Sequence, residues 1–301
     1  MPPWSGTGIS TLVIGTGPGL ETLAGSSRVA VLDDSPSRVP PGMVHVGPIA
    51  ALDRFLAAGD VTNVALCMAE HQWPMAEELV RTCLARSVEV FIPVVVRPAG
   101  AGRARRLLKR TIDVVGAMTG LAALAPLLAA AIVAIVIDDG RPAIFRQFRA
   151  GQDGRPFGVY KLRTMTRDAD HQRGTLRSSS DVNGAAFKMR VDPRITRVGR
   201  WLRRTSIDEL PQLINVLKGE MSLVGPRPHP YDDVARYRPW HLRRLSVKPG
   251  ITGLWQVELR NDPDFDRWVG KDLEYIERWS IRLDLSILAR TIPALFRGEG
   301  R

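Results

Sequence analysis

Two adjacent carboxylates, Asp208 and Glu209, stand in the stretch of the chain whose residue types best suit chemistry. Arginines precede them, among them Arg203, and Arg227 follows on a loop with a proline on either side. Arginine binds phosphate oxygens through paired hydrogen bonds, and the N-terminus of a helix also favours anions. Cations on both sides of a carboxylate pair therefore indicate a site that holds a phosphate ester and attacks it.

The same residues also have a purely structural interpretation. Ser206 and Glu209 have the spacing of a capping box, in which two side chains satisfy free N–H groups of the first helical turn. Pro211 would lie just past that turn and remove a helical hydrogen bond, so we expect irregular geometry there. An apolar helical run follows, and Gly219 is expected to end it. This segment alone does not decide between capping and catalysis.

The stretch RTSIDELPQLINVLKGEMSLVGPRP, residues 204–228, resembles the signature of the bacterial sugar transferases, the monotopic polyprenyl-phosphate phosphoglycosyl transferases. Further similar segments lie on both sides in the expected order, over roughly residues 105 to 297, so the match is more specific than any single motif. These segments are KRTIDVVGAMTGLAALAPLL (109–128), FRQFRAGQDGRPFGVYKLRTM (145–165), FKMRVDPRITRVGRWLRR (187–204), KPGITGLWQV (248–257) and LDLSIL (283–288).

The resemblance implies a reaction and roles for its residues. A hexose 1-phosphate would pass from a nucleoside diphosphate sugar, expected to be a UDP-sugar, to a polyprenyl phosphate such as undecaprenyl phosphate. Asp208 matches the family's nucleophile, which would carry the phosphosugar covalently, and Glu209 matches its partner. Attack by an anion on a diphosphate needs charge neutralisation, so we expect Mg²⁺ or Mn²⁺ at Asp208 and Glu209. Phosphate contacts are expected from Lys161, Arg163, Arg203 and Arg227.

Such a transfer would begin the synthesis of an exopolysaccharide, an O-antigen or a capsule glycan. A contrasting hypothesis is a catalytically inactive, basic peripheral-membrane protein that scaffolds the polysaccharide machinery. Transfer of labelled sugar phosphate from a UDP-sugar to undecaprenyl phosphate distinguishes the two. One departure from the family pattern is Glu220, which stands where Asp is more usual.

Charge divides the 301-residue chain into two parts. Residues 1–100 carry 6 Lys and Arg against 9 Asp and Glu, whereas residues 101–301 carry 36 against 22. The second part is therefore expected to meet an anionic partner, either anionic phospholipid or a phosphate-bearing substrate. We find no zinc-finger spacing, RNP pattern or basic-helix heptads, so nucleic acid is not an expected partner.

Residues 1–98 alternate strand-like and helix-like runs, which predicts a small parallel sheet. A glycine-rich loop, residues 15–19, follows the first run, as in a dinucleotide-binding unit. Its last glycine falls one place early, and too few residues remain before the next strand for the helix that would receive a pyrophosphate. We therefore expect a degenerate Rossmann-like domain without NAD, with Cys67 and Cys83 as buried, reduced thiols. The expected strands are Thr11–Ile14, Val29–Leu32, Val61–Met68 and Val88–Val95, and the expected helices cover residues 49–58 and 74–86.

The stretch RPAGAGRARR, residues 97–106, is rich in Pro, Gly and Arg. It predicts a linker, placed at residues 99–108, that leads to an apolar region, residues 109–139. The run from Val114 to Ile137 has 24 residues and no charge, which is long enough to span a bilayer. Pro126 at its middle removes a helical hydrogen bond, and neither half alone crosses a core of ~30 Å. Basic residues flank both ends, which favours entry and exit on the same, cytoplasmic side. We therefore expect a re-entrant hairpin that breaks at Pro126, as the resemblance also implies.

Residues 140–301 are expected to form the sugar-phosphate transferase domain. A turn at residues 248–253 leads into a predicted short strand, Leu254–Val257, and residues 265–296 have amphipathic helical spacing that suits either a membrane interface or a globular core. The fold class is therefore α/β: a small Rossmann-like parallel-sheet domain, then a mainly helical, membrane-inserted catalytic domain with few short strands.

The predicted location is the inner, cytoplasmic membrane, with both domains on the cytoplasmic face, because nucleotide sugars are made in the cytoplasm. The expected partners are a nucleoside diphosphate sugar, a polyprenyl phosphate and anionic phospholipid. The sequence leaves a homodimer open.

Overall fold

The computed structural model describes residues 11–17, 20–23, 29–41, 43–59, 61–68, 75–93, 102–189 and 191–296. The chain divides into two compact units. The first unit joins Met1–Arg97 with two later segments, and the second unit contains the rest. The later segments of the first unit are Ala150–Pro156 and Pro230–Ser246. Residues 99–101 of the predicted linker lie outside the described residues.

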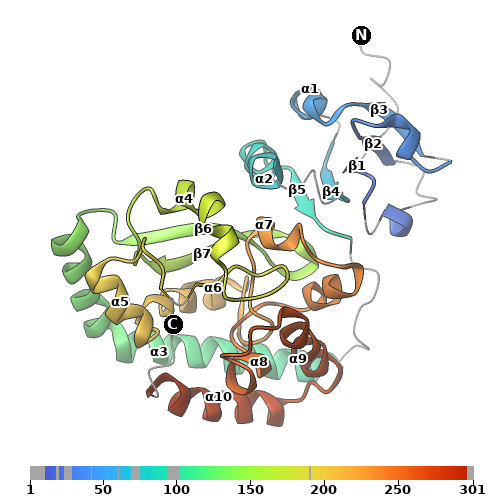
Figure 1. The fold of residues 1–301 in the computed structure, drawn as a ribbon. Helices are drawn as coiled ribbons and strands as arrows, with labels where there is room; N and C mark the ends of the chain where they lie inside the picture. Colours follow the sequence, from blue (N-terminus) through green and yellow to red (C-terminus); the bar gives the residue numbers. More distant parts are fainter. Residues whose placement is uncertain are drawn as a thin grey trace. The chain divides into compact units, whose positions relative to one another are not determined.

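The first unit contains a parallel sheet with the strand order β3-β2-β1-β4-β5 (Figure 1). Its central strands are rich in Val, Leu and Ile and are almost completely buried, as expected of a parallel sheet that is covered on both faces. The α/β class predicted from the sequence is therefore confirmed. The strands are β1 (Thr11–Ile14), β2 (Val29–Leu32), β3 (Val44–Gly47), β4 (Asn63–Leu66) and β5 (Glu89–Phe91).

Short helices connect these strands. Between β1 and β2 the described residues form one 3-10 turn, η1 (Leu20–Leu23), in place of a full crossover helix. Later connections contain α1 (Leu52–Ala58) and α2 (Ala76–Ala85), close to the predicted helices. Both cysteines are free and buried. Residues 18 and 19 of the predicted glycine-rich loop lie outside the described residues.

Two segments from the later part of the chain pack with this sheet domain. Ile92 follows β5, and its N–H donates to the carbonyl of Asp153, 2.9 Å away, in the turn η5 (Gln152–Gly154). The buried Tyr231, first residue of α7 (Tyr231–Val234), donates its hydroxyl to the carbonyl of Gly154 at 2.7 Å. The turn η8 (Pro239–Ser246) completes the unit.

The second unit is built around the long helix α3 (Arg103–Asp139), whose helical backbone continues through Pro126. Among the described residues it is the one helix long and apolar enough to cross a membrane. Only 11% of its most apolar 18-residue window is buried inside the protein. A long apolar surface left open in this way is typical of a helix that contacts lipid.

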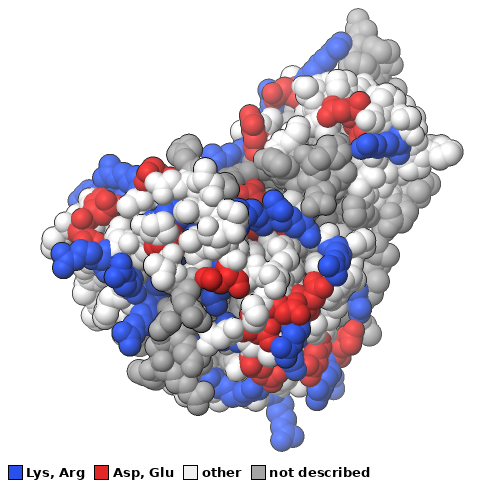
Figure 2. All heavy atoms as spheres, viewed as in Figure 1, with Lys and Arg blue, Asp and Glu red and all other residues white. Residues whose placement is uncertain are grey.

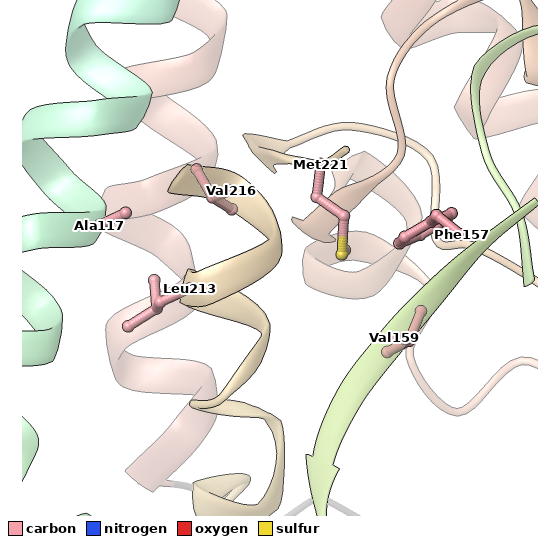
Figure 3. Packing of buried hydrophobic residues seen from close by; sticks show 6 residues of the cluster. All are labelled: Ala117, Phe157, Val159, Leu213, Val216 and Met221. Atoms are coloured by element: carbon pink, nitrogen blue, oxygen red, sulfur yellow. The ribbon is translucent and has the colours of Figure 1, made fainter. Parts of the chain in front are cut away.

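The N-terminal half of α3 packs on helix α6 (Gln212–Lys218) and on strands β7 (Pro156–Leu162) and β8 (Ser222–Val224). Ala117 meets Leu213 and Val216 of α6, in a cluster that also contains Val159 (Figure 3). Small residues let the helices approach closely: a Cβ on Gly120 would lie 3.1 Å from the side chain of Leu213. This cluster fixes the position of α6.

The C-terminal half of α3 packs under the segment that precedes α6. Ala131 and Ile135 of α3 belong to one buried cluster with Leu162, Leu202 and Ile207. Leu202 lies in helix α5 (Arg197–Arg204), and Ile207 begins a 3-10 turn, η7 (Ile207–Glu209). Both halves of α3 therefore hold elements that carry the predicted site residues.

Polar contacts tie both ends of α3 to the second unit. Near its start, Lys109 donates to Asp284 at 2.8 Å, and the buried Asp113 accepts from the hydroxyl of Ser222 at 2.9 Å. Near its end, Asp138 accepts from the backbone N–H of Val198 at 3.1 Å. These partners keep the charged residues at the ends of α3 out of the apolar surface between them.

The rest of the second unit corrects two predictions. Leu254–Val257 is not a strand but begins the helix α8 (Leu254–Glu258), because the extended Gly253 starts a helical turn there. The predicted helical run over 265–296 is two helices, separated at Arg278–Ser280. The α-helices and strands not yet given are β6 (Ile144–Ala150), which pairs with β7, α4 (Ala169–Leu176), β9 (Gly250–Thr252), which pairs with β8, α9 (Phe265–Glu277) and α10 (Ile281–Phe296).

Candidate active site

The predicted carboxylates lie on η7, between α5 and α6. Ser206 precedes this turn in the left-handed conformation, with φ 56°, which is unusual for a residue other than glycine, and the chain turns sharply there. Its side chain caps no backbone group, and Pro211 lies at the N-cap of α6. The capping-box alternative is therefore wrong, and the irregular geometry expected around Pro211 is present.

Glu209 is held by two cations. Lys161 Nζ donates to Glu209 Oε1 at 2.7 Å, and Arg227 makes a fork to both carboxylate oxygens, with Nη1 3.1 Å from Oε2. The three residues come from β7, from η7 and from the loop after β8. Burial would raise the pKa of Glu209, but Arg227 and Lys161 together outweigh burial and hold it well below its usual range. Glu209 is therefore ionised at neutral pH.

Asp208 is in a different state from its neighbour. Its side chain is 6% exposed, and it accepts no hydrogen bond from the part of the chain that the structure describes. Burial, against the opposing charge of Lys161 and with a further contribution from Glu209, raises its pKa to about 6, although Arg203 and Arg227 also act to lower it. A buried carboxylate without hydrogen bonds keeps its lone pairs for a reacting atom or a metal ion.

Arg203 lies on the last turn of α5 and supplies positive charge to Asp208. Its Nε donates to the hydroxyl of Thr164 at 2.8 Å. Burial lowers the pKa of this guanidinium, while the charges of Asp208 and Asp192 raise it. Arginine remains a cation at any ordinary pH, so Arg203 is a buried positive charge that balances part of the carboxylate pair.

Lys161 lies in the same group of charges, and burial lowers its pKa to about 8, against the opposing effect of Glu209. The structure thus brings together five of the predicted residues: Lys161, Arg203, Asp208, Glu209 and Arg227. Arg163 is not among the charges that act on Asp208 or Glu209; it lies at the C-terminal end of α3. Pro126 lies inside α3, which is one continuous helix, so the predicted break into a hairpin at this residue is not present in the structure.

Two residues near this group were not predicted from the sequence. Arg149 adds positive charge beside Lys161 and donates to the carbonyl of Pro228, the residue after Arg227, at 2.8 Å. Arg260 approaches the hydroxyl of Ser206 at 3.4 Å. The chain contains many arginines, so residue type alone could not single out these two. Figure 2 shows that positive and negative side chains are intermixed on the visible face. Their contacts therefore distinguish them, whereas their residue type does not.

The carboxylate pair fits the predicted divalent metal in its chemistry. Mg²⁺ binds in proteins through one or two carboxylates together with substrate phosphates and water. Asp208 and Glu209 are adjacent, and Asp208 has lone pairs that no described residue occupies. Among the described residues no group of three or more His, Cys, Asp or Glu could hold a metal ion without a substrate.

Comparisons with known proteins match the second part of the chain. The model of the bacterial sugar transferase family matches residues 104–298. A protein of Salmonella typhimurium called undecaprenyl-phosphate galactose phosphotransferase is 43% identical over 204 residues, which are 66% of this chain and 43% of that protein. The galactosyl transferase CpsE of Streptococcus agalactiae is 46% identical over 195 residues, which are 64% of this chain and 43% of that relative.

A shorter relative matches in the same way. The UDP-glucose:undecaprenyl-phosphate glucose-1-phosphate transferase of Caulobacter vibrioides is 46% identical over 197 residues, which are 63% of this chain and 70% of that protein. The match to the first two relatives covers less than half of their length. The likeness therefore covers residues 104–298 and the site that they contain.

Proposed function

The chain belongs to the bacterial sugar transferase family, and from this we propose that it transfers a hexose 1-phosphate from a UDP-sugar to undecaprenyl phosphate. The observation that carries the proposal is the asymmetry of the carboxylate pair. Glu209 is fixed by Lys161 and Arg227, while Asp208 is buried and accepts no hydrogen bond from a described residue. One carboxylate is thus held by cations, and its neighbour is left for attack.

The proposed first step is attack by a carboxylate oxygen of Asp208 on the β-phosphorus of the donor. A bond forms between that oxygen and phosphorus, and the bond from phosphorus to the bridging oxygen breaks, so nucleoside monophosphate leaves with the electron pair. In the second step a phosphate oxygen of undecaprenyl phosphate attacks the same phosphorus, and the carboxylate of Asp208 is released. The covalent route replaces the direct attack of one anionic substrate on the other by two successive displacements.

The cations have separate roles in this mechanism. Arg203 and Arg227 lie near Asp208 and can bind the phosphate oxygens whose charge grows during attack. Lys161 orients Glu209 through the 2.7 Å contact. A divalent metal held by Asp208, Glu209 and the substrate would neutralise further phosphate charge.

The proposal includes a monotopic attachment to the inner membrane with both domains on the cytoplasmic face. Both ends of α3 are bonded to one folded unit: Lys109 and Asp113 to α10 and β8, and Asp138 to α5. A spanning helix would place these partners on opposite sides of the bilayer. An α3 that enters and leaves the bilayer on the same side keeps these partners together and leaves its apolar surface in lipid.

The experiment is transfer of labelled hexose 1-phosphate from UDP-glucose or UDP-galactose to undecaprenyl phosphate in membranes. Asp208→Asn should abolish transfer and leave membrane association unchanged, because an amide cannot attack phosphorus. The matched control is Glu78→Gln, at an exposed acidic position of α2, which should transfer like the parent. If Asp208→Asn keeps the parent's turnover, Asp208 is not the nucleophile; if the parent transfers nothing from any UDP-sugar, the scaffold hypothesis is favoured.

A further inference from the structure

Arg163 lies at the C-terminal end of the membrane helix and follows β7 directly. Its side chain is 7% exposed. Nη2 donates to the carbonyl oxygens of Asp139, at 3.0 Å, and Gly140, and the same nitrogen is 3.3 Å from the carboxylate of Asp139. The last carbonyls of a helix lack partners within the helix and carry partial negative charge, so a buried guanidinium satisfies them well. Arg163 therefore fastens the end of α3 to β7.

The next residue extends this link to the carboxylate pair. The hydroxyl of Thr164 accepts from Arg203 Nε at 2.8 Å, and Arg203 is one of the positive charges that act on Asp208. The backbone carbonyl of Thr164 also accepts from the N–H of Thr196, the N-cap of α5, at 3.1 Å. The end of α3, residues 163 and 164, and the helix that carries Arg203 therefore form one bonded series.

Apolar packing follows the same route. Leu162, Leu202 and Ile207 pack with Ala131 and Ile135 of α3 in one cluster. Each of the first three precedes a residue of this series or of the site: Arg163, Arg203 and Asp208. The C-terminal half of α3 thus packs against the residue that precedes each of Arg163, Arg203 and Asp208. Because the packing is close, a shift of this half of α3 would be transmitted to those three residues.

We propose that Arg163 is a positioning residue, which sets Arg203 relative to Asp208 by holding the C-terminal half of α3 against β7 and α5. This inference rests on the proposed function for its reaction. It gives Arg163 a different role from the phosphate contact that the sequence indicated. The membrane-embedded half of α3 is then part of the support of the active site as well as an anchor.

The test is the steady-state kinetics of Arg163→Gln in membranes, with the UDP-sugar and undecaprenyl phosphate varied in turn. A displacement of about 1 Å at a reacting group can cost ~100-fold in rate. We expect kcat to fall roughly 10- to 100-fold while KM for each substrate stays within about twofold. Arg163→Lys should recover part of kcat, since its ammonium can still donate to the two carbonyls. The control Arg167→Gln removes an exposed arginine whose Nη2 lies 3.5 Å from the same Asp139 carbonyl, and it should behave like the parent.

If Arg163 instead binds a phosphate of a substrate, the substitution should change KM and leave kcat unchanged. If KM for either substrate rises about tenfold and kcat is kept, Arg163 binds that substrate, for instance through Nε and Nη1, which have no hydrogen-bond partner among the described residues. If Arg163→Gln does not fold, Thr164→Val removes only the hydroxyl that holds Arg203, and a kcat equal to the parent's overturns the proposal. Transfer by the parent, measured in the same assay, separates a failure of this inference from a failure of the proposed function.

Discussion

Two neighbouring carboxylates in this site have pKa values that move in opposite directions. Burial dominates for Asp208, which no described residue bonds, whereas two cations overcome burial for Glu209. When the pKa values of two neighbouring carboxylates are moved apart in this way, the two groups can take different roles in a reaction. The carboxylate with the higher pKa is also the better nucleophile when ionised, and near pH 7 most of it is ionised.

The first prediction is a bell-shaped pH profile of kcat/KM for the donor. Only ionised Asp208 can attack, so activity should fall as pH drops through about 6, the raised pKa of this group. Lys161 must be protonated to hold Glu209, so activity should also fall as pH rises through about 8. Lys161→Arg should remove the fall at high pH, because arginine does not titrate there. A flat profile from pH 5 to 7 would contradict the assignment of Asp208.

The sequence could bring most of the candidate site residues together because they lie close to one another along the chain. The order of Arg203, Asp208, Glu209 and Arg227 along one short segment is visible without a structure. The sequence did not show that Arg163 serves the end of α3, or that Arg149 and Arg260 lie near the site. These roles depend on contacts between segments more than 20 residues apart, and arginine occurs throughout the second part of the chain.

At the scale of the elements, helix α5 must come very close to the strand side of the site. A Cβ on Gly199 would lie 2.1 Å from the carbonyl oxygen of Thr164, which is backbone and cannot turn away. Gly199 therefore allows the approach that places Thr164 beside Arg203.

The second prediction compares two glycines in helices. Gly199→Ala should lower the free energy of unfolding by about 1–3 kcal/mol through overpacking, and should slow transfer because α5 must shift. Gly270→Ala, in α9, has no atom within 4 Å of the new Cβ and should stabilise by about 0.5–1 kcal/mol. Thermal unfolding in detergent measures both. Equal effects of the two substitutions would contradict the packing described for α5.

The third prediction concerns the topology of α3. Cysteines at the exposed positions Leu107 and Ile144, introduced after removal of Cys67 and Cys83, should both be protected from an impermeant thiol reagent added outside the cell. Pro126→Leu restores the helical hydrogen bond that a proline cannot make and so favours a straight apolar helix, and part of the population should then insert across the bilayer and transfer should fall. Labelling of either cysteine from outside in the parent would contradict the re-entrant arrangement.

Secondary structure was predicted best where periodicity is long. Strands β1, β2, β4 and β5 and helix α2 match their predicted runs to within a few residues, whereas β3 was not predicted and Leu254–Val257 proved helical. A run of four residues, three of them apolar, fits a strand or a helical turn equally well, so periodicity cannot decide between the two. The extended Gly253 and the burial of Leu254 and Trp255 settle it in the fold.

At the scale of the whole molecule, the boundary between the two units does not follow the sequence. Ala150–Pro156 connects β6 to β7, and Pro230–Ser246 begins three residues after Arg227, yet both segments belong with the sheet domain. A boundary placed from composition near residue 98 could not reveal this, because the contacts that join these segments to the sheet domain, such as Ile92 N–H to Asp153 and Arg155 to Glu89, link residues far apart in the sequence.

The fourth prediction tests that joint. Tyr231→Phe removes the hydroxyl that donates to Gly154 and leaves a carbonyl without this partner, so unfolding should become easier by about 1–2 kcal/mol. Gly154→Ala should cost more, because φ is 67° and the new Cβ would lie 2.3 Å from Ile92. Thermal unfolding measures both, with the solvent-exposed Val44→Thr as a control. A larger loss for Tyr231→Phe than for Gly154→Ala would contradict this packing.

The central claim is that Asp208 carries the phosphosugar, and incubation with donor alone tests it most directly. Purified protein, a labelled UDP-sugar and Mg²⁺, without undecaprenyl phosphate, should release one nucleoside monophosphate per active site and leave labelled phosphosugar on the peptide that contains Asp208. Asp208→Asn should show neither product. If active protein, quenched rapidly, releases no nucleoside monophosphate until undecaprenyl phosphate is added and yields no labelled peptide, transfer is direct and the covalent mechanism is wrong.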